Sequence, residues 1–198
     1  MKLHYTTAFV VAGLLGAMPT HAADIATGKA PAAACFDAAQ TVSLSGKALS
    51  DVQNQDALSS CADALSNKLT AKDRIATLIN RGTIESASGD VTASLADYDA
   101  ALAMNPKMSD IFINRGTALM RAARYDEARA SFDQAVALGG SNTYIAYFNR
   151  AMAEEKVGNV NGAYQDYKLA VASAPNYQPA KHELARLQAI VPHTKGQS

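Results

Sequence analysis

Few side chains in this sequence have the types and spacing that catalysis needs. The segment His182 to Arg186 reads His-Glu-Leu-Ala-Arg, close to the HExxH pattern in which two histidines on one helix face bind zinc. Arg186 stands where the second histidine would be and cannot bind zinc, so the metalloprotease interpretation fails. Gly28-Lys29 lacks the upstream glycine and the hydroxyl residue of a phosphate-binding loop, and no GxSxG motif occurs. We therefore expect no enzyme activity, no catalytic or metal site and no cofactor, unless the chain has a site of an unfamiliar type.

Neighbouring carboxylates are the other candidates for acid/base chemistry. They form the pairs Asp97/Asp99 and Glu154/Glu155. Such pairs are more typical of a solvated helix face than of a general acid and base, and we interpret them in that way.

The composition excludes several classes of protein. The 18 basic residues balance the 18 acidic ones, which gives no electrostatic reason to expect a nucleic acid or an anionic lipid as a partner. The hydrophobic fraction of 48% and the charged fraction of 18% are those of a packed protein rather than a disordered one. A chain of 198 residues is long enough to bury a core as one domain.

The N-terminus has the layout of a secretory signal. Lys2 precedes an apolar run from Ala8 to Met18, and Thr20-His21-Ala22 supplies small residues for cleavage after Ala22 or Ala23. The apolar run is too short for a membrane anchor, which needs about 20 residues. No later stretch approaches that length, so we expect no membrane span in the mature chain. These features predict a signal peptide over residues 1–22 and an exported protein, with a bacterial periplasm as its location.

Export determines how the only two cysteines, Cys35 and Cys61, are interpreted. Their spacing fits neither a CxxC redox motif nor a zinc site. In an oxidising compartment such a pair most often forms a structural disulfide, which for a loop of this size stabilises the fold by about 3–4 kcal/mol. Two separately buried free thiols are the alternative.

A pattern repeats along the chain at intervals of about 34 residues. Each copy has Asn-Arg followed by a small residue, then a second small residue, an aromatic residue and a pair of apolar residues. The three copies begin at Asn80, Asn114 and Asn149. The small residues are Gly82 and Ser94, Gly116 and Ala128, Ala151 and Ala163; the aromatic residues are Tyr98, Phe132 and Tyr167.

Each copy has the helical periodicity of two helices joined by a short turn. Gly89 and Gly158 suit the left-handed conformation that ends a helix, and Asp90 and Asn159 suit the cap of the next one. Ala123 replaces this glycine in the second copy. The small residues allow the two helices to approach closely beside the aromatic side chain. Because one helical hairpin cannot bury both of its faces, the copies must stack.

This pattern resembles the tetratricopeptide repeat over about residues 75–177. The family's small residues at repeat positions 8 and 20, its aromatic residue at position 24, Ala at 27 and Pro at 32 all have counterparts here, including Pro106 and Pro175. The second copy departs from the pattern because Gly139-Gly140 replaces its proline. Arginines at positions 81, 115 and 150 also stand where the family prefers leucine.

The resemblance implies an all-α fold, a right-handed α-hairpin solenoid of about three repeats. An N-terminal helical hairpin with the disulfide would precede the repeats, since Ala57, Cys61 and Ala64 repeat the spacing of a second helix. We expect its helices near residues 32–42 and 51–66. A capping helix with a polar face would follow the repeats. The predicted segments are a signal peptide (1–22), a flexible N-terminus (23–30), the hairpin (31–73), three repeats (75–108, 109–143 and 144–177), the capping helix (178–191) and a flexible tail (192–198).

The same resemblance places a partner-binding groove on the first helix of each repeat. An apolar ladder of Ile79, Ile113 and Phe148 with two adaptable methionines would suit a peptide with apolar anchors. Alternatively, the protein's own terminal helix or a neighbouring chain covers this ladder. The predicted groove residues are Ile79, Thr83, Ile113, Thr117, Met120, Phe148 and Met152.

Some members of the family bind carboxylate-terminated peptides through a clamp of Lys, Asn and Arg. Only Asn114 matches that clamp; the other four positions hold Ile79, Thr83, Ile145 and Asn149, so we do not expect carboxylate clamping. We expect the arginine row to pair with acidic residues of the same chain.

Together these features predict a non-catalytic, exported protein-protein interaction module or scaffold that binds a peptide or protein partner of unknown identity. The first alternative is a self-associating structural subunit or spacer of a cell-envelope assembly. The second is a periplasmic holdase-like chaperone.

Overall fold

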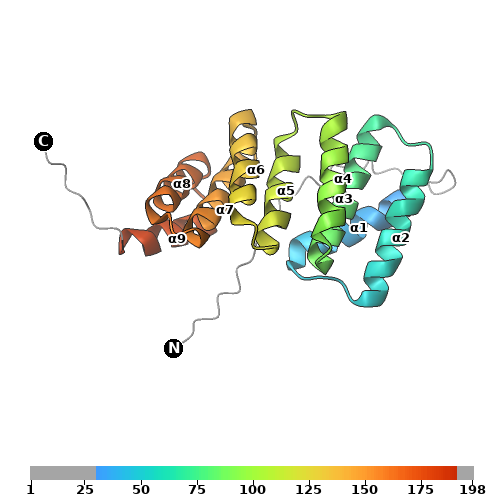
Figure 1. Cartoon of the computed structure of the whole chain (residues 1–198), viewed down its shortest axis with the longest axis horizontal. Coiled ribbons are helices and arrows are strands. Elements are labelled where there is room, and N and C mark those ends of the chain that lie inside the picture. Colours follow the sequence, from blue (N-terminus) through green and yellow to red (C-terminus); the bar gives the residue numbers. More distant parts are fainter. Residues whose placement is uncertain (1–29, 191–198) are drawn as a thin grey trace, which may run out of the picture. The chain divides into compact units, whose positions relative to one another are not determined.

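The computed structural model describes residues 30–190 and shows an all-α helical-repeat fold (Figure 1). The predicted signal peptide, flexible N-terminus up to residue 29 and tail from residue 191 lie outside the described residues. The described part contains nine helices and no strands. They are α1 (Ala30–Ser45), α2 (Asp51–Ser66), α3 (Ala71–Ser88), α4 (Val91–Met104), α5 (Ser109–Arg121), α6 (Tyr125–Leu138), α7 (Thr143–Lys156), α8 (Val160–Ser173) and α9 (Gln178–Gln188).

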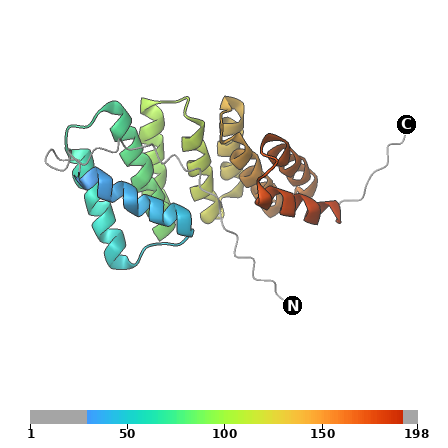
Figure 2. The same cartoon turned by 180° about the vertical axis from the view of Figure 1, so that it is seen from behind.

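The chain divides into two compact units, the first ending at Pro106 and the second beginning at Lys107. Helices α3 and α4 form a hairpin in the first unit, as do α5 with α6 and α7 with α8 in the second. Helix α1 packs against both α2 and α3, and Figure 2 shows it lying across them. Each predicted repeat thus contains one helical hairpin. In residues 30–190, no helix has the length and apolarity needed to cross a lipid bilayer.

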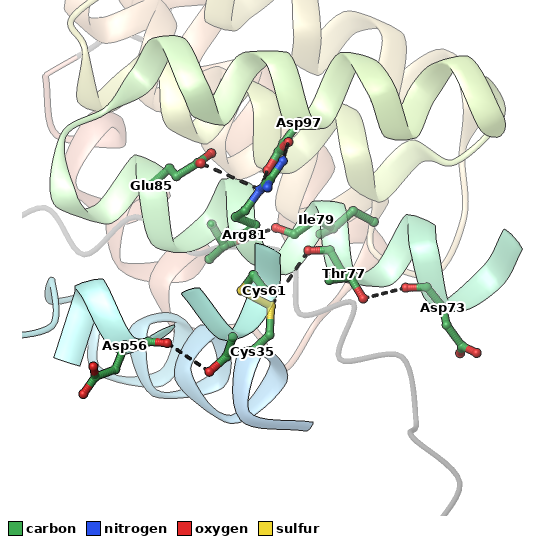
Figure 3. The surroundings of a disulfide bond; sticks show 11 residues. Cys35, Asp56, Cys61, Asp73, Thr77, Ile79, Arg81, Glu85 and Asp97 are labelled. Carbon is green, nitrogen blue, oxygen red and sulfur yellow. Dashed lines mark hydrogen bonds and ion pairs between the residues drawn. A yellow bond between two sulfur atoms is a disulfide. The ribbon is translucent and has the colours of Figure 1, made fainter. Parts of the chain in front are cut away.

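The two cysteines form the predicted disulfide, which joins α1 to α2 (Figure 3). Both cysteines are fully buried. The disulfide lies in a small core whose other buried members are Ala39, Ala57 and Ile84. Because two of the five buried members are alanines and two are cysteines, this core buries little apolar area, and the covalent bond adds to what holds α1 in place.

The turns between paired helices follow the predicted chemistry. Gly89 (φ 94°) and Gly158 (φ 83°) take positive φ values after α3 and α7. Asp90 and Asn159 then cap the following helices, because their side-chain oxygens accept hydrogen bonds from the backbone N–H groups of Ala93 and Gly162. Ala123 has φ 57° at the corresponding turn of the middle repeat. An alanine therefore adopts the left-handed conformation that glycine takes in the other two.

The small residues of the repeat lie against the aromatic residues, as predicted. Tyr98, Phe132 and Tyr167 are almost completely buried. A Cβ atom placed on Gly116 would lie 2.5 Å from Cε1 of Phe132, so the absence of a side chain allows this close approach. At Gly82 the nearest atom, Cε1 of Tyr98, would be 3.0 Å away.

Helix α9 packs on α8 and is tied to α7 by polar contacts. Arg186 donates hydrogen bonds to Glu183 of its own helix and to Glu155 of α7. Glu155 also accepts a hydrogen bond of 2.7 Å from the Tyr167 hydroxyl. Because burial and this acidic neighbour disfavour the phenolate, the pKa of Tyr167 is well above its ordinary value.

Candidate partner-binding face

The predicted groove residues lie on the first helix of each hairpin, but they do not form an open apolar surface. Their exposed fractions are between 0% and 8%, with Ile113 at 0%. The expectation of an exposed ladder is therefore wrong for the described structure. These residues are on α3 (Ile79 and Thr83), α5 (Ile113, Thr117 and Met120) and α7 (Phe148 and Met152).

The two threonines use their hydroxyl groups within the chain. Thr83 donates to the carbonyl oxygen of Ile79, and its Oγ1 lies 3.2 Å from the Tyr98 hydroxyl. Thr117 donates to the carbonyl oxygen of Ile113 and accepts a hydrogen bond from Nδ2 of Asn149. Since the hydroxyl groups of Ser and Thr often form such bonds within a helix, repeat position alone did not establish that these hydroxyl groups were available to a partner.

Aromatic side chains enclose Phe148 in the second unit. Its ring centroid lies 5.6 Å from that of Tyr167 and 5.3 Å from that of Tyr177, the residue that precedes α9. Tyr144, one turn before Phe148 on α7, also packs edge-on against Tyr177. Part of the predicted ladder is thus covered by the protein's own C-terminal segment, as the alternative interpretation expected. Burial raises the pKa of Tyr177 above its ordinary value.

The same helices carry buried amide groups that the chain does not fully use. Asn80 on α3 is 4% exposed, and its Nδ2 has no hydrogen-bond partner in the described structure. Asn114 on α5 is 2% exposed, and its Oδ1 likewise has none. Buried polar groups without partners are uncommon in native proteins. The sequence signal for these buried amides is the recurrence of asparagine at 80, 114 and 149, which the predicted groove residues did not include.

The positions of the carboxylate clamp carry no cation. Ile79, Thr83, Ile145 and Asn149 are buried on the first helices, and neither they nor Asn114 supply positive charge. A carboxylate would lose its hydration there without gaining a charged partner.

Two arginines of the row, Arg81 and Arg150, pair with acidic residues of the chain, as predicted. Arg81 forms two hydrogen bonds of 2.6 Å with Asp97, and Arg150 forms two of 2.7 Å with Asp166. Arg115 donates to the hydroxyl of Ser131. Each contact joins the first helix of a repeat to its second helix.

The interpretation of two carboxylates as solvated was wrong. Asp97 is buried because Arg81 binds it, and Glu154 is buried because it accepts hydrogen bonds from Arg129 and Asn159. Sequence alone did not show these partners, since Arg129 belongs to the preceding hairpin. Both carboxylates are used in ion pairs that hold helices together.

The near-HExxH segment has no arrangement for metal chemistry. His182 lies on the exposed side of α9, where its Nδ1 is 3.1 Å from Oε1 of Glu183, and Arg186 takes part in the contacts to α7. Across residues 30–190, no group of three or more His, Cys, Asp or Glu side chains could hold a metal ion.

Comparison with known families agrees with this helical-hairpin architecture. The tetratricopeptide repeat model matches residues 79–143 and 113–177, which together span half of the chain. The chain belongs to the tetratricopeptide repeat family. Human sperm-associated antigen 1 is 26% identical over 98 residues, which make up 50% of this chain and 10% of the human protein. The match thus spans only about a tenth of that relative.

Solved structures share the fold at low sequence identity. The TTC0263 protein of Thermus thermophilus superposes with a TM-score of 0.64 at 19% identity, covering 83% of this chain and 84% of that one. The second repeat domain of human RPAP3, solved in complex with the HSP70 peptide SGPTIEEVD, gives a TM-score of 0.55 at 24% identity, covering 60% and 98%. The first domain of Spaghetti (RPAP3), bound to the HSP90 peptide SRMEEVD, gives 0.56 at 22%, covering 62% and 95%.

Proposed function

We propose that this chain is a non-catalytic, exported interaction module that binds a peptide or protein partner on the α5–α7 face of its second unit. The family includes domains that bind peptides, as the two RPAP3 complexes illustrate. Helices α5 and α7 contact one another. Ile113 and Asn114 lie on α5, and Phe148 lies on α7.

The observation that carries this proposal is the unbonded Oδ1 of Asn114, 2% exposed in the middle of α5. Leaving a buried acceptor without a donor costs about 1–3 kcal/mol. A peptide backbone N–H would satisfy it and recover that energy. Because Met120 and Met152 have flexible side chains, they can move to admit an apolar residue of the partner beside the amide.

The chemistry of this face defines the partner's requirements. A partner needs a backbone segment with free hydrogen-bonding groups and apolar anchors. It does not need a C-terminal carboxylate, since the clamp positions carry no cation. Peptides such as those in the RPAP3 complexes, which end in acidic sequence, are therefore not the preferred class for this chain.

Selection from a phage-displayed random peptide library tests the proposal. The selected peptides are then measured by fluorescence anisotropy against the wild type, Asn114→Ala and Gln134→Ala. Gln134 is an exposed amide on α6, so its variant is a matched control. We expect Asn114→Ala to weaken binding at least tenfold while circular dichroism remains native, and Gln134→Ala to bind normally. Equal binding by a folded Asn114→Ala would contradict the proposal.

Export is tested separately. Cell fractionation of a host that expresses the full chain, followed by N-terminal sequencing, should find a periplasmic protein that begins at Ala23 or Asp24. Retention of Met1 in a cytoplasmic product would contradict export. Size-exclusion chromatography with light scattering addresses the self-association alternative, because a structural subunit would form oligomers whose size depends on concentration.

A further inference from the structure

Two glutamates occupy the same repeat position but have different surroundings. Glu154, near the end of α7, has both carboxyl oxygens bonded: Oε1 accepts from Nε of Arg129 at 2.9 Å, and Oε2 accepts from Nδ2 of Asn159 at 2.6 Å. One donor comes from the preceding helix α6 and the other from the turn before α8. This carboxylate is therefore compensated although it is buried.

Glu85, the corresponding residue near the end of α3, lacks both donors. Leu58 of α2 stands at the repeat position of Arg129, and Asp90 stands at that of Asn159. Oε2 of Glu85 is buried and has no hydrogen-bond partner in the described structure. A leucine cannot donate a hydrogen bond, and an ionised aspartate repels a second carboxylate.

Arg81 does not compensate for the missing donors. Its Nε lies 3.9 Å from Oε1 of Glu85, whereas it forms two hydrogen bonds of 2.6 Å with Asp97. Figure 3 shows the guanidinium between the two carboxyl groups, with Asp97 reached from α4. The Arg81 guanidinium thus faces both Glu85 and Asp97 but forms hydrogen bonds only with Asp97.

The charged groups around Glu85 are predominantly acidic. Helix α4 and its cap contribute Asp97 and Asp90, and α3 itself contributes Arg81. Burial and these two aspartates raise the pKa of Glu85 to about 7, against the opposing effect of Arg81. On α1 and α2, the other elements packed against α3, the ionisable residues are exposed and make no hydrogen bond or ion pair to Glu85 in the described structure: Asp37, Asp51, Asp56 and Asp63.

We infer that Glu85 is a pH-sensitive switch in the first unit: protonation of its carboxyl group tightens the α3–α4 junction, and ionisation loosens it. Leaving the buried oxygen without a donor costs less for the neutral carboxyl group than for the carboxylate, and the neutral group is not repelled by Asp90 and Asp97. It also carries a proton that it can donate to Asp97. The ionised group must instead draw water into the junction.

The direction of the pH effect follows from the raised pKa. The folded state holds the Glu85 proton at pH values where the unfolded chain, with its pKa near 4.5, has lost it. The folded state binds more protons in this interval, so stability falls as the pH rises from about 4.5 through about 7. Acidification from pH 8 to pH 6 should therefore stabilise the first unit, which is the opposite of the usual behaviour of a carboxylate held by an ion pair.

Hydrogen exchange measured by mass spectrometry on the full, disulfide-bonded chain tests this switch. Exchange is compared at pH 6 and pH 8 after correction for the intrinsic rates. For peptides that cover residues 78–98 of the wild type, we expect protection to fall about tenfold from pH 6 to pH 8. Glu85→Gln should keep the pH 6 protection at both values, since the amide is neutral throughout. Equal protection of the wild type at the two pH values would overturn the inference.

Two further variants separate the missing donor from a general effect of substitution. Asp90→Asn retains a capping side chain and restores the donor found at Asn159, so it should remove most of the pH dependence. Glu154→Gln is the matched control: it should lower protection of α7 at both pH values and leave residues 78–98 unchanged. If Glu85→Gln retains the full wild-type pH dependence, Glu85 is not the switch. If Asp90→Asn retains it, the missing donor at residue 90 is not what makes Glu85 respond to pH.

Discussion

Arg150 and Asp166 form a two-pronged ion pair across the third repeat, with Nε and a terminal nitrogen of the arginine each 2.7 Å from a carboxylate oxygen. The pair joins α7 to α8, and the Asp166 side chain is only 8% exposed. The hydrogen bonds to Asp166 raise the pKa of Arg150 above its already high value. The same arginine also reaches Asp133 on α6, whose side chain is 57% exposed.

These two partners of one guanidinium allow a direct comparison. Asp166→Ala should lower the free energy of unfolding by about 2 kcal/mol. It removes two hydrogen bonds and leaves the largely buried Arg150 guanidinium without its buried carboxylate partner. Asp133→Ala should cost less than about 1 kcal/mol, because water screens an exposed pair. Urea denaturation monitored by circular dichroism measures both. Equal costs would show that burial does not determine the strength of these pairs.

The sequence predicted the repeat hairpins because their determinants are local. Asn, Arg and a small residue recur at a fixed interval, and Gly89, Asp90 and Asn159 act within their own turns. The disulfide was also predictable, since Cys35 had only Cys61 as a partner.

The site was less predictable because its properties depend on distant contacts. The exposure of Phe148 depends on its contact with Tyr177. The charge of the buried Glu154 carboxylate is stabilised by a hydrogen bond from Arg129. Neither contact follows from the spacing within one repeat. The repeat position therefore predicted the helix on which each residue lies, whereas the tertiary packing decided its exposure.

Ala123 provides a test of backbone strain in the middle repeat. Its φ of 57° lies in the left-handed region, where a Cβ atom is unfavourable. Ala123→Gly should therefore raise the free energy of unfolding by up to about 1 kcal/mol. The relief of strain is partly offset because glycine increases the conformational entropy of the unfolded chain.

The neighbouring Ala122 is the matched control, since its φ is −79°. Ala122→Gly relieves no strain and should lower stability by about 0.5–1 kcal/mol. Thermal melts of the two variants should thus shift in opposite directions. A lower melting temperature for Ala123→Gly would mean that the turn is not strained in solution.

Gly116 tests the close approach of α5 and α6. In Gly116→Ala the added Cβ would lie 2.5 Å from the Phe132 ring, which is completely buried and cannot move freely. We expect a loss of about 1–3 kcal/mol, as for other overpacked cores. Gly82→Ala should cost less, because its nearest atom is 3.0 Å away and Ala151 already occupies the corresponding position of the third repeat. Denaturant midpoints that rank the two variants in the reverse order would contradict this account.

Variants of Ile113 test whether this position of α5 packs inside the second unit or contacts a partner. The side chain is fully buried, so Ile113→Glu must place a carboxylate in an apolar site without a partner. We expect it to destabilise the second unit by about 3 kcal/mol or more, or to prevent its folding. Ile113→Val keeps the apolar character and should cost only about 0.5–1.5 kcal/mol.

The informative measurement combines the stability of Ile113→Val with its affinity for the selected peptides. A smaller apolar side chain that only packs inside the unit should change stability and leave the affinity within about twofold of the wild type. A residue that contacts the partner should lose affinity as well, because binding energy concentrates at central apolar positions from which water is excluded. If Ile113→Glu instead remains as stable as the wild type, the face is open in solution and Ile113 does not belong to the core.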